Sequence, residues 1–247
     1  MPIRQFDSIL DCGFDMDKCV VITGTSSGLG LETSIHLLEK GYTVIGIDVN
    51  PQTDISHSRF ESVTMDLSCG SLEQTVVEVL SERALYAMIH CAGVSIGDKV
   101  SRLRDKDWSK SIEVNLTSAM KLCRLSSKHM IDGGRILLIG SPVGLVGANK
   151  PSYAASKAGL HALTMSVSRE VGLRGILVNT ILPGPMFSGM TSDWSQDKQN
   201  RIASETRIGR LCDPMEVAQF IGFLLSRQCS YMTASIVDMT AGSMFGH

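Results

Sequence analysis

A tyrosine and a lysine four positions apart, Tyr153 and Lys157 in the segment YAASK, are the first residues of this sequence that could carry acid–base chemistry. On a helix this spacing places both side chains on one face. A free tyrosine, with a pKa of about 10, is a poor base at neutral pH. A neighbouring ammonium stabilises the phenolate and lowers that pKa, so Tyr153 could exchange a proton with an alcohol. The alternative is structural, since isolated pairs at this spacing are common in helices.

A serine and an asparagine earlier in the chain could complete such a site. Ser141 stands twelve positions before Tyr153, directly after the apolar run ILLIG. Ligands bind at the carboxyl ends of strands in open α/β sheets, where a hydroxyl could hydrogen-bond a carbonyl or alkoxide oxygen. Asn115 lies in the helical stretch VNLTSA, where an apolar residue is expected. Because helix interiors disfavour asparagine, we expect it to have a functional role or to hold a buried water.

A glycine cluster, TGTSSGLG at residues 23–30, follows a short apolar run and opens a helical pattern. Its glycines are Gly24, Gly28 and Gly30. Such a loop lets backbone N–H groups approach a pyrophosphate, and the positive end of the following helix favours the same anion. Three glycines in a turn are weak evidence alone, because a plain strand-to-helix turn needs glycine too. The context of strand, glycine loop and helix favours a dinucleotide site.

An acidic residue, Asp48, ends the second apolar run, 18 positions beyond Gly30. A carboxylate there can accept hydrogen bonds from the adenosine ribose hydroxyls and repels a 2′-phosphate. No lysine or arginine occurs at 25–27 or 49–54 to reverse this preference. The sequence therefore predicts NAD rather than NADP. Asp48 would be only a surface charge at the end of a strand if the glycine loop bound no dinucleotide.

The elements that must position these residues alternate along the chain. Strands are expected at 19–23, 43–48, 62–66, 86–91, 135–140, 176–182 and 235–239. Helices are expected at 29–39, 72–81, 102–130 with a break near 107, 152–171 and 214–225. This pattern predicts a single-domain, doubly wound α/β fold of Rossmann type, with a seven-stranded parallel sheet covered by helices on both faces. Only 51–61 separate the second and third strands, so the helix usual there should be short or absent.

The domain is expected to span 18–247, after an N-terminal extension at 1–17. Within it, 185–210 is rich in loop residues and is interpreted as a substrate lid. Its apolar side chains suit a hydrophobic or cyclic alcohol, although such residues more often pack a lid against the body; they are Met186, Phe187, Met190 and Trp194.

Composition excludes several other classes. Hydrophobic residues make up 43% and charged residues 19%, which is not typical of a disordered or coiled-coil chain. A net charge of −2 gives no basic field for nucleic acid or an anionic membrane. The seven cysteines form no CxxC pair and the six histidines do not cluster, so no metal site is expected. The first residues have four aspartates and no apolar core, which favours a cytoplasmic protein.

Taken together, these motifs resemble the classical subfamily of the short-chain dehydrogenase/reductases. The family's motifs occur here in its order and spacing: TGTSSGLG, Asp48, Asp66-Leu67, CAG at 91–93, VNLTSA, IGSPVG, YAASKAG and Pro183-Gly184. GRLCDPMEVA at 209–218 and the YMT turn at 231–233 extend the match, which covers about residues 18 to 240.

The resemblance implies four catalytic residues. Asn115 would hold a relay water, Ser141 would polarise the substrate oxygen, and Tyr153 would be the acid/base. Lys157 would lower the tyrosine pKa and bind the nicotinamide ribose.

The resemblance also implies the cofactor-binding residues. Asp66 would touch adenine, while Ile181 and 183–188 would line the nicotinamide. The full set is Gly24, Ser26, Ser27, Gly28, Leu29, Gly30, Asp48, Val49, Asp66, Leu67, Cys91, Ala92, Gly93, Tyr153, Lys157, Pro183, Gly184, Met186 and Ser188. Family members usually form homotetramers through the helices carrying Asn115 and Tyr153, so a homotetramer or homodimer is expected.

Three departures from the family pattern are visible. His90-Cys91 replaces two asparagines that brace the central strands. The interval from Ser141 to Tyr153 is one residue shorter than is commonest, and the tail MTAGSMFGH replaces a frequent DGG ending. None removes one of the four catalytic residues.

The leading hypothesis is an NAD(H)-dependent oxidoreductase that interconverts a secondary alcohol and a ketone. An alternative is a 3-oxoacyl thioester reductase, whose usual preference for NADPH disagrees with Asp48. A third reading, from another class, is a dinucleotide-binding scaffold or sensor without turnover, which the presence of Tyr153 and Lys157 disfavours.

Overall fold

The computed structural model of the chain describes residues 18–186, 191 and 193–243. Its centre is one seven-stranded sheet in the order β3-β2-β1-β4-β5-β6-β7, in which all neighbouring strands are parallel. The order reverses between β1 and β4, and this switch point opens a crevice at the carboxyl edge of the sheet. The strands are β1 Cys19–Thr23, β2 Thr43–Asp48, β3 Phe60–Thr64, β4 Leu85–His90, β5 Met130–Ile139, β6 Leu177–Pro183 and β7 Ser235–Met239.

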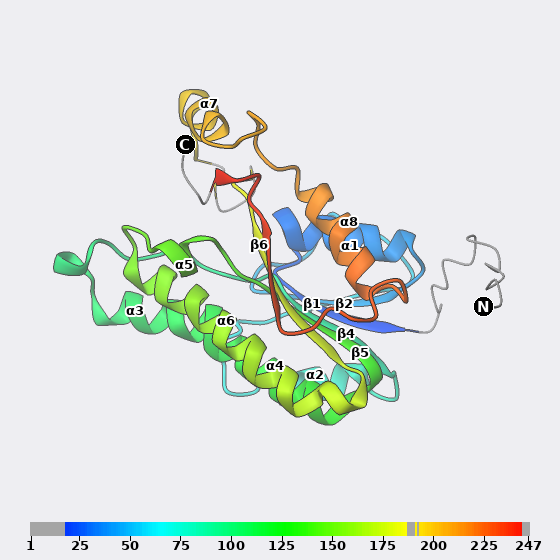
Figure 1. Cartoon of the computed structure of the whole chain (residues 1–247). Helices are drawn as coiled ribbons and strands as arrows, with labels where there is room; N and C mark the ends of the chain where they lie inside the picture. Colours follow the sequence, from blue (N-terminus) through cyan, green and yellow to red (C-terminus); the bar gives the residue numbers. More distant parts are fainter. Residues whose placement is uncertain (1–17, 187–190, 192, 244–247) are drawn as a thin grey trace.

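Helices cover both faces of the sheet (Figure 1). Helices α1 (Gly28–Glu39) and α8 (Pro214–Leu225) pack together on one face. The other face carries α2 (Leu72–Leu80), α3 (Asp105–Ile112), α4 (Ser118–His129) and α6 (Pro151–Val171). The predicted doubly wound fold is confirmed.

Each central strand is buried on both sides, which explains its continuous apolar run. In β1, Val21 belongs to the core under α2 and α4, whereas Val20 and Ile22 belong to the core under α1 and α8. Successive side chains of a strand point to opposite faces, so a strand between two helical layers needs apolar residues at every position.

The third strand was expected at 62–66 but spans Phe60–Thr64. Its pairing with β2 sets these limits, because Val44 lies opposite Phe60 and Asp48 lies opposite Thr64. The strand lies at the edge of the sheet and is partly exposed, so no apolar run marks its bounds. The connection at 51–59 contains no helix, which confirms that the usual crossover helix is absent.

The predicted helix 102–130 is divided differently from the expectation. A short 3-10 turn, Val100–Arg102, precedes α3, and the break falls at 103–104 rather than near 107. Asp105 and Asp107 lie in the first turn of α3, where carboxylates favour a helix start. Between α3 and α4 the chain forms a π-turn, Glu113–Thr117, that carries Asn115. Such turns insert one residue into a helix and are frequent at functional sites.

The fifth strand begins at Met130, five residues before the expected start. Met130 pairs with Leu85 across an irregularity in β4, and glycines 133 and 134 interrupt the apolar pattern that would have revealed the pairing. Strands β4 and β6 differ from the expected bounds by one residue, a difference within the usual uncertainty of strand ends.

A buried arginine joins the amino end of the sheet to α8. The guanidinium of Arg135 is 7% exposed and has no carboxylate partner among the described residues. The last carbonyls of a helix lack partners within the helix, and a cation there also favours the helix dipole. The Arg135 donors fill this role by hydrogen bonds to the carbonyls of Leu224, Ser226, Cys229, Gly133 and Gly134.

The next two observations are limited to the part of the chain that the structure describes. No helix there is long and apolar enough to cross a membrane. No group of three or more histidine, cysteine or acidic side chains is arranged there to hold a metal.

Candidate active site

Ser141, Tyr153 and Lys157 come together at the carboxyl edge of the sheet. Tyr153 and Lys157 lie on α6, and Ser141 follows the end of β5. The hydroxyl of Ser141 lies near enough to that of Tyr153 to lower the pKa of Tyr153. The Nζ of Lys157 lies 5.8 Å from the centre of the Tyr153 ring and donates a hydrogen bond of 2.7 Å to the carbonyl of Ile139. The loop after β5 and one face of α6 thus build a single polar centre.

Burial controls the ionisation of this centre. It lowers the pKa of Lys157, which is 3% exposed, to about 8. It also raises the pKa of Tyr153, against a smaller lowering by the hydrogen bond from Ser141. The sequence predicted the opposite direction for Tyr153, through the ammonium of Lys157. That ammonium instead hydrogen-bonds the carbonyl of Ile139.

Asn115 is fully buried in the π-turn, and its side chain is committed to protein partners. Its Nδ2 donates to the Val94 carbonyl and to Ser156 Oγ, both at 2.9 Å. Its Oδ1 accepts from Val94 N at 2.7 Å. Ser156 Oγ in turn donates to the carbonyl of Tyr153 at 2.8 Å. This chain of bonds fixes Tyr153 relative to the loop after β4.

Gly93 lies beside both Asn115 and Lys157. A β-carbon at Gly93 would lie 3.4 Å from Asn115 Oδ1 and 3.5 Å from Lys157 Nζ. The missing side chain therefore leaves both polar groups facing the space beside the backbone of 91–93. Sequence reasoning overlooked Ser156, although it is the serine of the YAASK segment.

His90 takes over the bracing role of the missing asparagines. Its Nε2 lies 2.7 Å from Ser118 Oγ, and Ser118 donates to the Val114 carbonyl at 2.7 Å. Ser118 must therefore accept from His90, which assigns the proton to Nε2. Burial and the charge of Lys157 lower the pKa of His90 to about 3, so the ring is neutral. It ties β4 to the π-turn that carries Asn115.

The neighbouring Cys91 is a thiol rather than a thiolate. Burial raises the pKa of Cys91 to about 12. Its place next to Ala92 and Gly93 puts it at the end of β4, where the sequence predicted cofactor contacts.

The glycine loop has the geometry of a pyrophosphate cradle. Gly24 has φ +78°, and a β-carbon there would lie 2.8 Å from Ala92 N. A β-carbon at Gly30 would lie 2.0 Å from the Gly24 carbonyl oxygen. Loops 23–30 and 91–93 therefore pack backbone against backbone, helped by a hydrogen bond from Ala92 N to Thr23 Oγ1 at 3.1 Å.

Helix α1 begins at this loop without a side-chain cap. Its N-cap residue Ser27 makes no capping hydrogen bond, so the amides of Gly28, Leu29 and Gly30 have no side-chain acceptor in the described part of the chain. Free first-turn amides together with the helix dipole favour an anion. The residues present thus fit the pyrophosphate of a dinucleotide.

Asp48 is held rigidly beside the glycine loop. Its Oδ2 accepts from Ser26 N at 3.0 Å, and its Oδ1 accepts from Asn50 N at 2.9 Å. Gln52 also ties the following connection to the loop, because its Nε2 donates to the Thr25 carbonyl. Gln52 was not predicted from the sequence, in which only its closeness to Asp48 marks it. Val49, between these contacts, is 61% exposed.

Asp66 and Leu67 have different surroundings. The Asp66 carboxylate accepts from Lys110 Nζ at 2.7 Å and from Ser68, and these contacts lower its pKa to about 2. Leu67 is 5% exposed and packs in the core. Lys110, on α3, is 44 positions from Asp66, and the sequence does not reveal this partner.

The predicted lid is anchored at its amino end. Gly184 N donates to the Met239 carbonyl at 3.0 Å, and Cys212 N donates to the Pro185 carbonyl at 2.9 Å. Met186 also forms an isolated parallel bridge with Cys212. Three predicted lid or cofactor residues, Phe187, Ser188 and Met190, lie outside the described residues.

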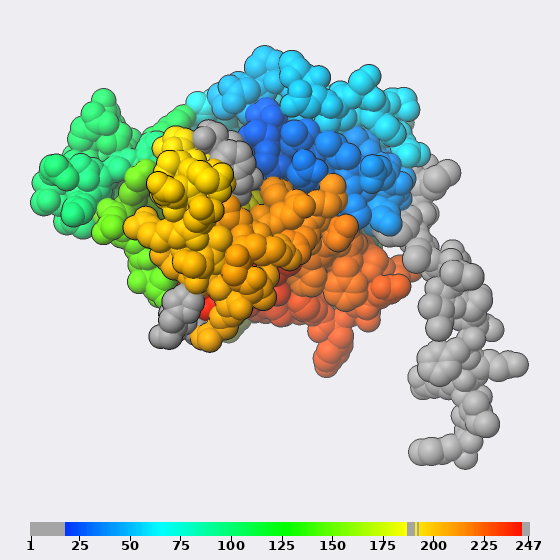
Figure 2. All heavy atoms as spheres, turned by 90° about the horizontal axis from the view of Figure 1, so that it is seen from above, coloured from blue at the N-terminus to red at the C-terminus, as the bar shows by residue number. Residues whose placement is uncertain are grey.

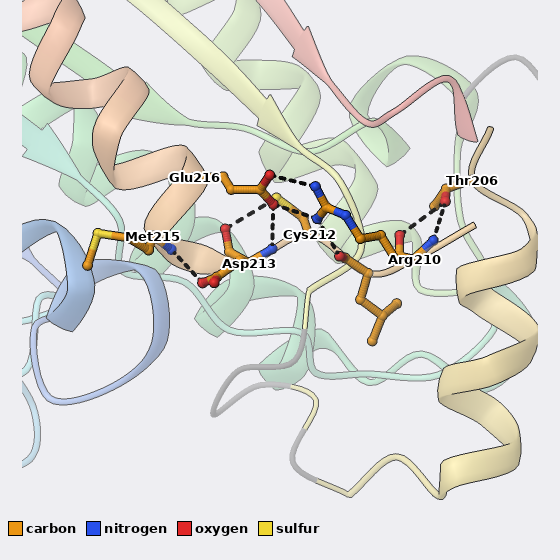
Figure 3. Close-up of polar contacts among 7 residues, drawn as sticks. Thr206, Arg210, Cys212, Asp213, Met215 and Glu216 are labelled. Carbon is orange, nitrogen blue, oxygen red and sulfur yellow. Dashed lines mark hydrogen bonds and ion pairs between the residues drawn. The ribbon is translucent and has the colours of Figure 1, made fainter. Parts of the chain in front are cut away.

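The carboxyl end of the lid is fixed by GRLCDPMEVA (Figure 3). The Arg210 guanidinium makes two hydrogen bonds of 2.7 Å to the Glu216 carboxylate. Glu216 also accepts from Asp213 N at 3.0 Å, and Asp213 accepts from Met215 N at 2.9 Å, which forms the capping box of α8. Thr206 Oγ1 accepts from Arg210 N at 3.2 Å. This motif is therefore an anchor of the lid and not a catalytic element.

Between these anchors, helix α7 (Gln196–Ser204) stands away from the sheet (Figure 1). It contains no buried residue. Viewed from above, the yellow segment that carries α7 lies between the green residues on one side and the blue N-terminal residues on the other (Figure 2). The side chain of Lys198 lies 4.9 Å from the centre of the Trp194 ring.

Comparison with known proteins identifies the family of the chain. The family model of short chain dehydrogenases matches residues 18–199, most of the chain. The chain belongs to the short-chain dehydrogenase family. This short-chain dehydrogenase is 31% identical over 235 residues to the 3-oxoacyl-acyl-carrier-protein reductase FabG of Vibrio harveyi, with 91% of the chain and 96% of the reductase covered. It is 29% identical to the (3R)-3-hydroxyacyl-CoA dehydrogenase of Homo sapiens, with 90% and 94% covered.

Solved structures agree with the sequence relatives. A 4-hydroxyisoleucine dehydrogenase complexed with NADH superposes with a TM-score of 0.85 at 27% identity, covering 93% of this chain and all (100%) of that one. A short-chain dehydrogenase/reductase from Serratia marcescens superposes with a TM-score of 0.82 at 26% identity, covering 92% and 98%. This short-chain dehydrogenase is an oxidoreductase that acts on CH–OH or carbonyl groups and uses a nicotinamide dinucleotide.

Proposed function

We propose that this short-chain dehydrogenase interconverts a secondary alcohol and a ketone with NAD(H), and that Tyr153 exchanges the proton. The observation that carries this proposal is the grouping of Ser141, Tyr153 and Lys157 at the same sheet edge as the glycine cradle. A bound nicotinamide supplies or accepts the hydride at the substrate carbon.

The residues of the chain account for the rest of the reaction. Ser141 Oγ holds the substrate oxygen near Tyr153 and stabilises charge as it develops there. In the reductive direction the protonated Tyr153 gives its proton to the ketone oxygen, and in the oxidative direction its phenolate takes the alcohol proton. The Lys157 ammonium and the backbone of Asn115 lie next along the path by which the proton can reach solvent.

Asp48 supports NAD over NADP. Its carboxylate is fixed by two backbone amides beside the glycine loop. A 2′-phosphate would bring negative charge against this carboxylate, whereas free ribose hydroxyls can donate to it. In the cofactor cleft, Gly24, Gly28 and Gly30 would hold the pyrophosphate and Asp66 would lie on the adenine side. Pro183, Gly184 and Met186 would lie on the nicotinamide side, as the sequence predicted.

A second candidate is reduction of a 3-oxoacyl thioester, because two relatives are named for 3-oxoacyl or 3-hydroxyacyl thioesters. A 3-oxoacyl thioester carries a ketone and its 3-hydroxyacyl product carries a secondary alcohol, so the same residues would act on them. The acyl chain would then lie under the lid, 185–210.

A substrate screen tests these alternatives. Secondary alcohols, ketones and 3-oxoacyl and 3-hydroxyacyl coenzyme A esters are each supplied with NAD(H) and NADP(H), and absorbance of the reduced nicotinamide is followed. Turnover of simple alcohols with NAD supports the leading proposal, and turnover of the thioesters alone favours the second. Dinucleotide binding without any turnover would indicate a scaffold or sensor.

We further propose that the protein acts as a homodimer or homotetramer in the cytoplasm. Trp108 on α3 and Met165 on α6 are 42% and 44% exposed, which favours coverage of this helical face by another copy. Six described cysteines are free thiols, which fits a reducing compartment. Light scattering at several protein concentrations checks the assembly, and a monomer at all of them contradicts it.

A further inference from the structure

His161, one helical turn beyond Lys157 on α6, is a buried imidazole to which the proposed reaction gives no role. Its side chain is 7% exposed, and its Nε2 has no hydrogen-bond partner in the part of the chain described here. Buried polar atoms are nearly always paired, so an unpaired nitrogen beside a reaction site requires an explanation. Tyr153, Lys157 and His161 follow one another at intervals of four on α6 and therefore share one face of the helix.

The imidazole lies against the loop that carries Ser141. A β-carbon at Gly140 would lie 3.3 Å from Nε2 of His161, and one at Gly144 would lie 2.9 Å from its Cε1. These glycines bracket Ser141, and Gly144 N donates to the Ser141 carbonyl at 3.0 Å to close the turn between them. The backbone on both sides of Ser141 thus rests on the ring, which limits where the serine hydroxyl can lie.

The surroundings of the ring favour its neutral form. The ring contacts the backbone at Gly140 and Gly144, and the side chains of Thr180 and Leu182 on β6 meet Gly140 from the same space; none of these groups titrates. On its own helix, the charge of Lys157 acts on the ring. Burial and that charge lower the pKa of His161. Protonation would therefore bring a second positive charge close to Lys157 without a compensating carboxylate.

We propose that His161 is a positioning residue: its neutral ring holds the loop 140–144 so that the Ser141 hydroxyl reaches Tyr153, and its protonation loosens this loop and reduces turnover at acid pH. The inference rests on the proposed function, because the Ser141–Tyr153 pair affects turnover only if it carries the reaction. It assigns the acid limb of the rate profile to a residue outside the four predicted catalytic ones.

Three variants of the full chain test this role. His161→Ala removes the ring, and His161→Phe keeps a flat ring that cannot be protonated. His57→Ala is the matched control, because it makes the same substitution at an exposed histidine in the connection 51–59. For each, kcat and KM are measured from about pH 5 to 8, the range in which histidine titrates. Folding is checked by circular dichroism.

For His161→Ala we expect kcat to fall by about tenfold or more, because a misplaced serine costs orientation, while the KM for the dinucleotide changes by less than about twofold. His161→Phe should recover most of kcat and lose the decline at acid pH. His57→Ala should match the unmodified protein. A folded His161→Ala protein with unchanged kcat overturns the inference, and so does an acid decline that persists in His161→Phe.

A titration without substrate or cofactor separates this inference from the proposed function. The ionisation of Tyr153 is followed by ultraviolet absorbance, as the difference between each protein and its Tyr153→Phe counterpart. Because the hydrogen bond from Ser141 lowers the pKa of Tyr153, both Ser141→Ala and His161→Ala should raise the midpoint. An unshifted midpoint in His161→Ala contradicts the positioning role whatever the activity. A shifted midpoint in a protein that turns over no substrate supports the positioning role and contradicts the proposed function.

Discussion

The amine of Lys157 lies 5.8 Å from the centre of the Tyr153 ring, and Lys157 is buried while Tyr153 is half-buried. Burial lowers the pKa of Lys157 to about 8 and raises that of Tyr153. A cation and a phenol are therefore enclosed together, with the Ser141 hydroxyl as the hydrogen-bond donor that favours the phenolate. Substitutions at each position separate their contributions.

Tyr153→Phe should remove the proton exchange without disturbing the cleft. We expect turnover to fall by about 10²–10⁴, as is typical for a lost general acid or base. Dinucleotide affinity should remain unchanged, which titration calorimetry measures. Near-normal turnover in this variant would show that another group carries the proton.

Lys157→Met should stabilise the protein while abolishing turnover. The folded-state pKa of Lys157 is about 8, below its ordinary 10.5. The unfolded chain therefore binds more protons between these values, and the free energy of unfolding rises as pH increases from 8 to 10.5. Below pH 8 the full cost of burying the ammonium is present, so removing it should raise Tm at neutral pH, by roughly 2–4 °C for each kcal/mol gained. Calorimetry across this pH range checks the prediction, and Lys128→Met, at an exposed position of α4, is the control. An equal gain in both variants would contradict it.

The dinucleotide preference should depend on Asp48. We expect NAD(H) to bind at least about tenfold more tightly than NADP(H), because the fixed carboxylate opposes the 2′-phosphate. Asp48→Ala combined with Val49→Arg should narrow the gap by removing the repulsion and adding a phosphate partner. Titration calorimetry with both cofactors decides the matter, and equal affinities in the unmodified protein would contradict the assignment.

His90 should make the fold sensitive to acid. Its folded-state pKa is about 3, against an ordinary 6.5. The unfolded chain binds the extra proton first, so stability falls as pH decreases from 6.5 towards 3. His90→Gln keeps a donor for Ser118 but cannot be protonated, and its unfolding midpoint in urea should therefore decline less over this range. The exposed His129→Gln serves as control. An identical decline in His90→Gln and the unmodified protein would falsify this explanation.

The lid should become more ordered when both ligands bind. Helix α7 has no buried residue, whereas its flanking segments are fixed by Cys212 and by the Arg210–Glu216 pair. Hydrogen exchange at 193–207 should therefore slow once dinucleotide and substrate are bound. Strong protection without ligands would instead indicate a fixed packing role. Trp194→Ala should raise KM for bulky substrates more than for small ones.

The sequence predicted those features that local pattern controls. Strands such as β1 and β2 are buried on both faces, so their apolar runs mark them clearly. The predicted bounds of the edge strand β3 were wrong by two residues, because a partly exposed strand has no continuous apolar run. The π-turn at Asn115 was not predicted, since one inserted residue barely alters helical periodicity.

Contacts between distant segments account for the rest of the site that the sequence did not predict. Lys110 meets Asp66 only because α3 packs beside the end of β3. His161 reads as an isolated histidine on a mixed helix, and its contact with Gly140 and Gly144 depends on how the Ser141 loop folds over α6. The direction of the Tyr153 pKa also depended on burial, which the Tyr153–Lys157 spacing does not encode.

The Arg135 guanidinium at the end of α8 has a consequence for salt tolerance. Its partners are backbone carbonyls in a buried setting, so dissolved ions cannot readily screen the attraction. Pairs such as Arg83–Glu61 and Arg174–Asp132 are exposed and weaken as ionic strength rises. In concentrated salt these surface ion pairs would weaken first. The joint between the sheet and the carboxyl end of α8 would persist. The exposed Arg210–Glu216 pair at the start of α8 would weaken with the other surface pairs, so the lid would lose this anchor first.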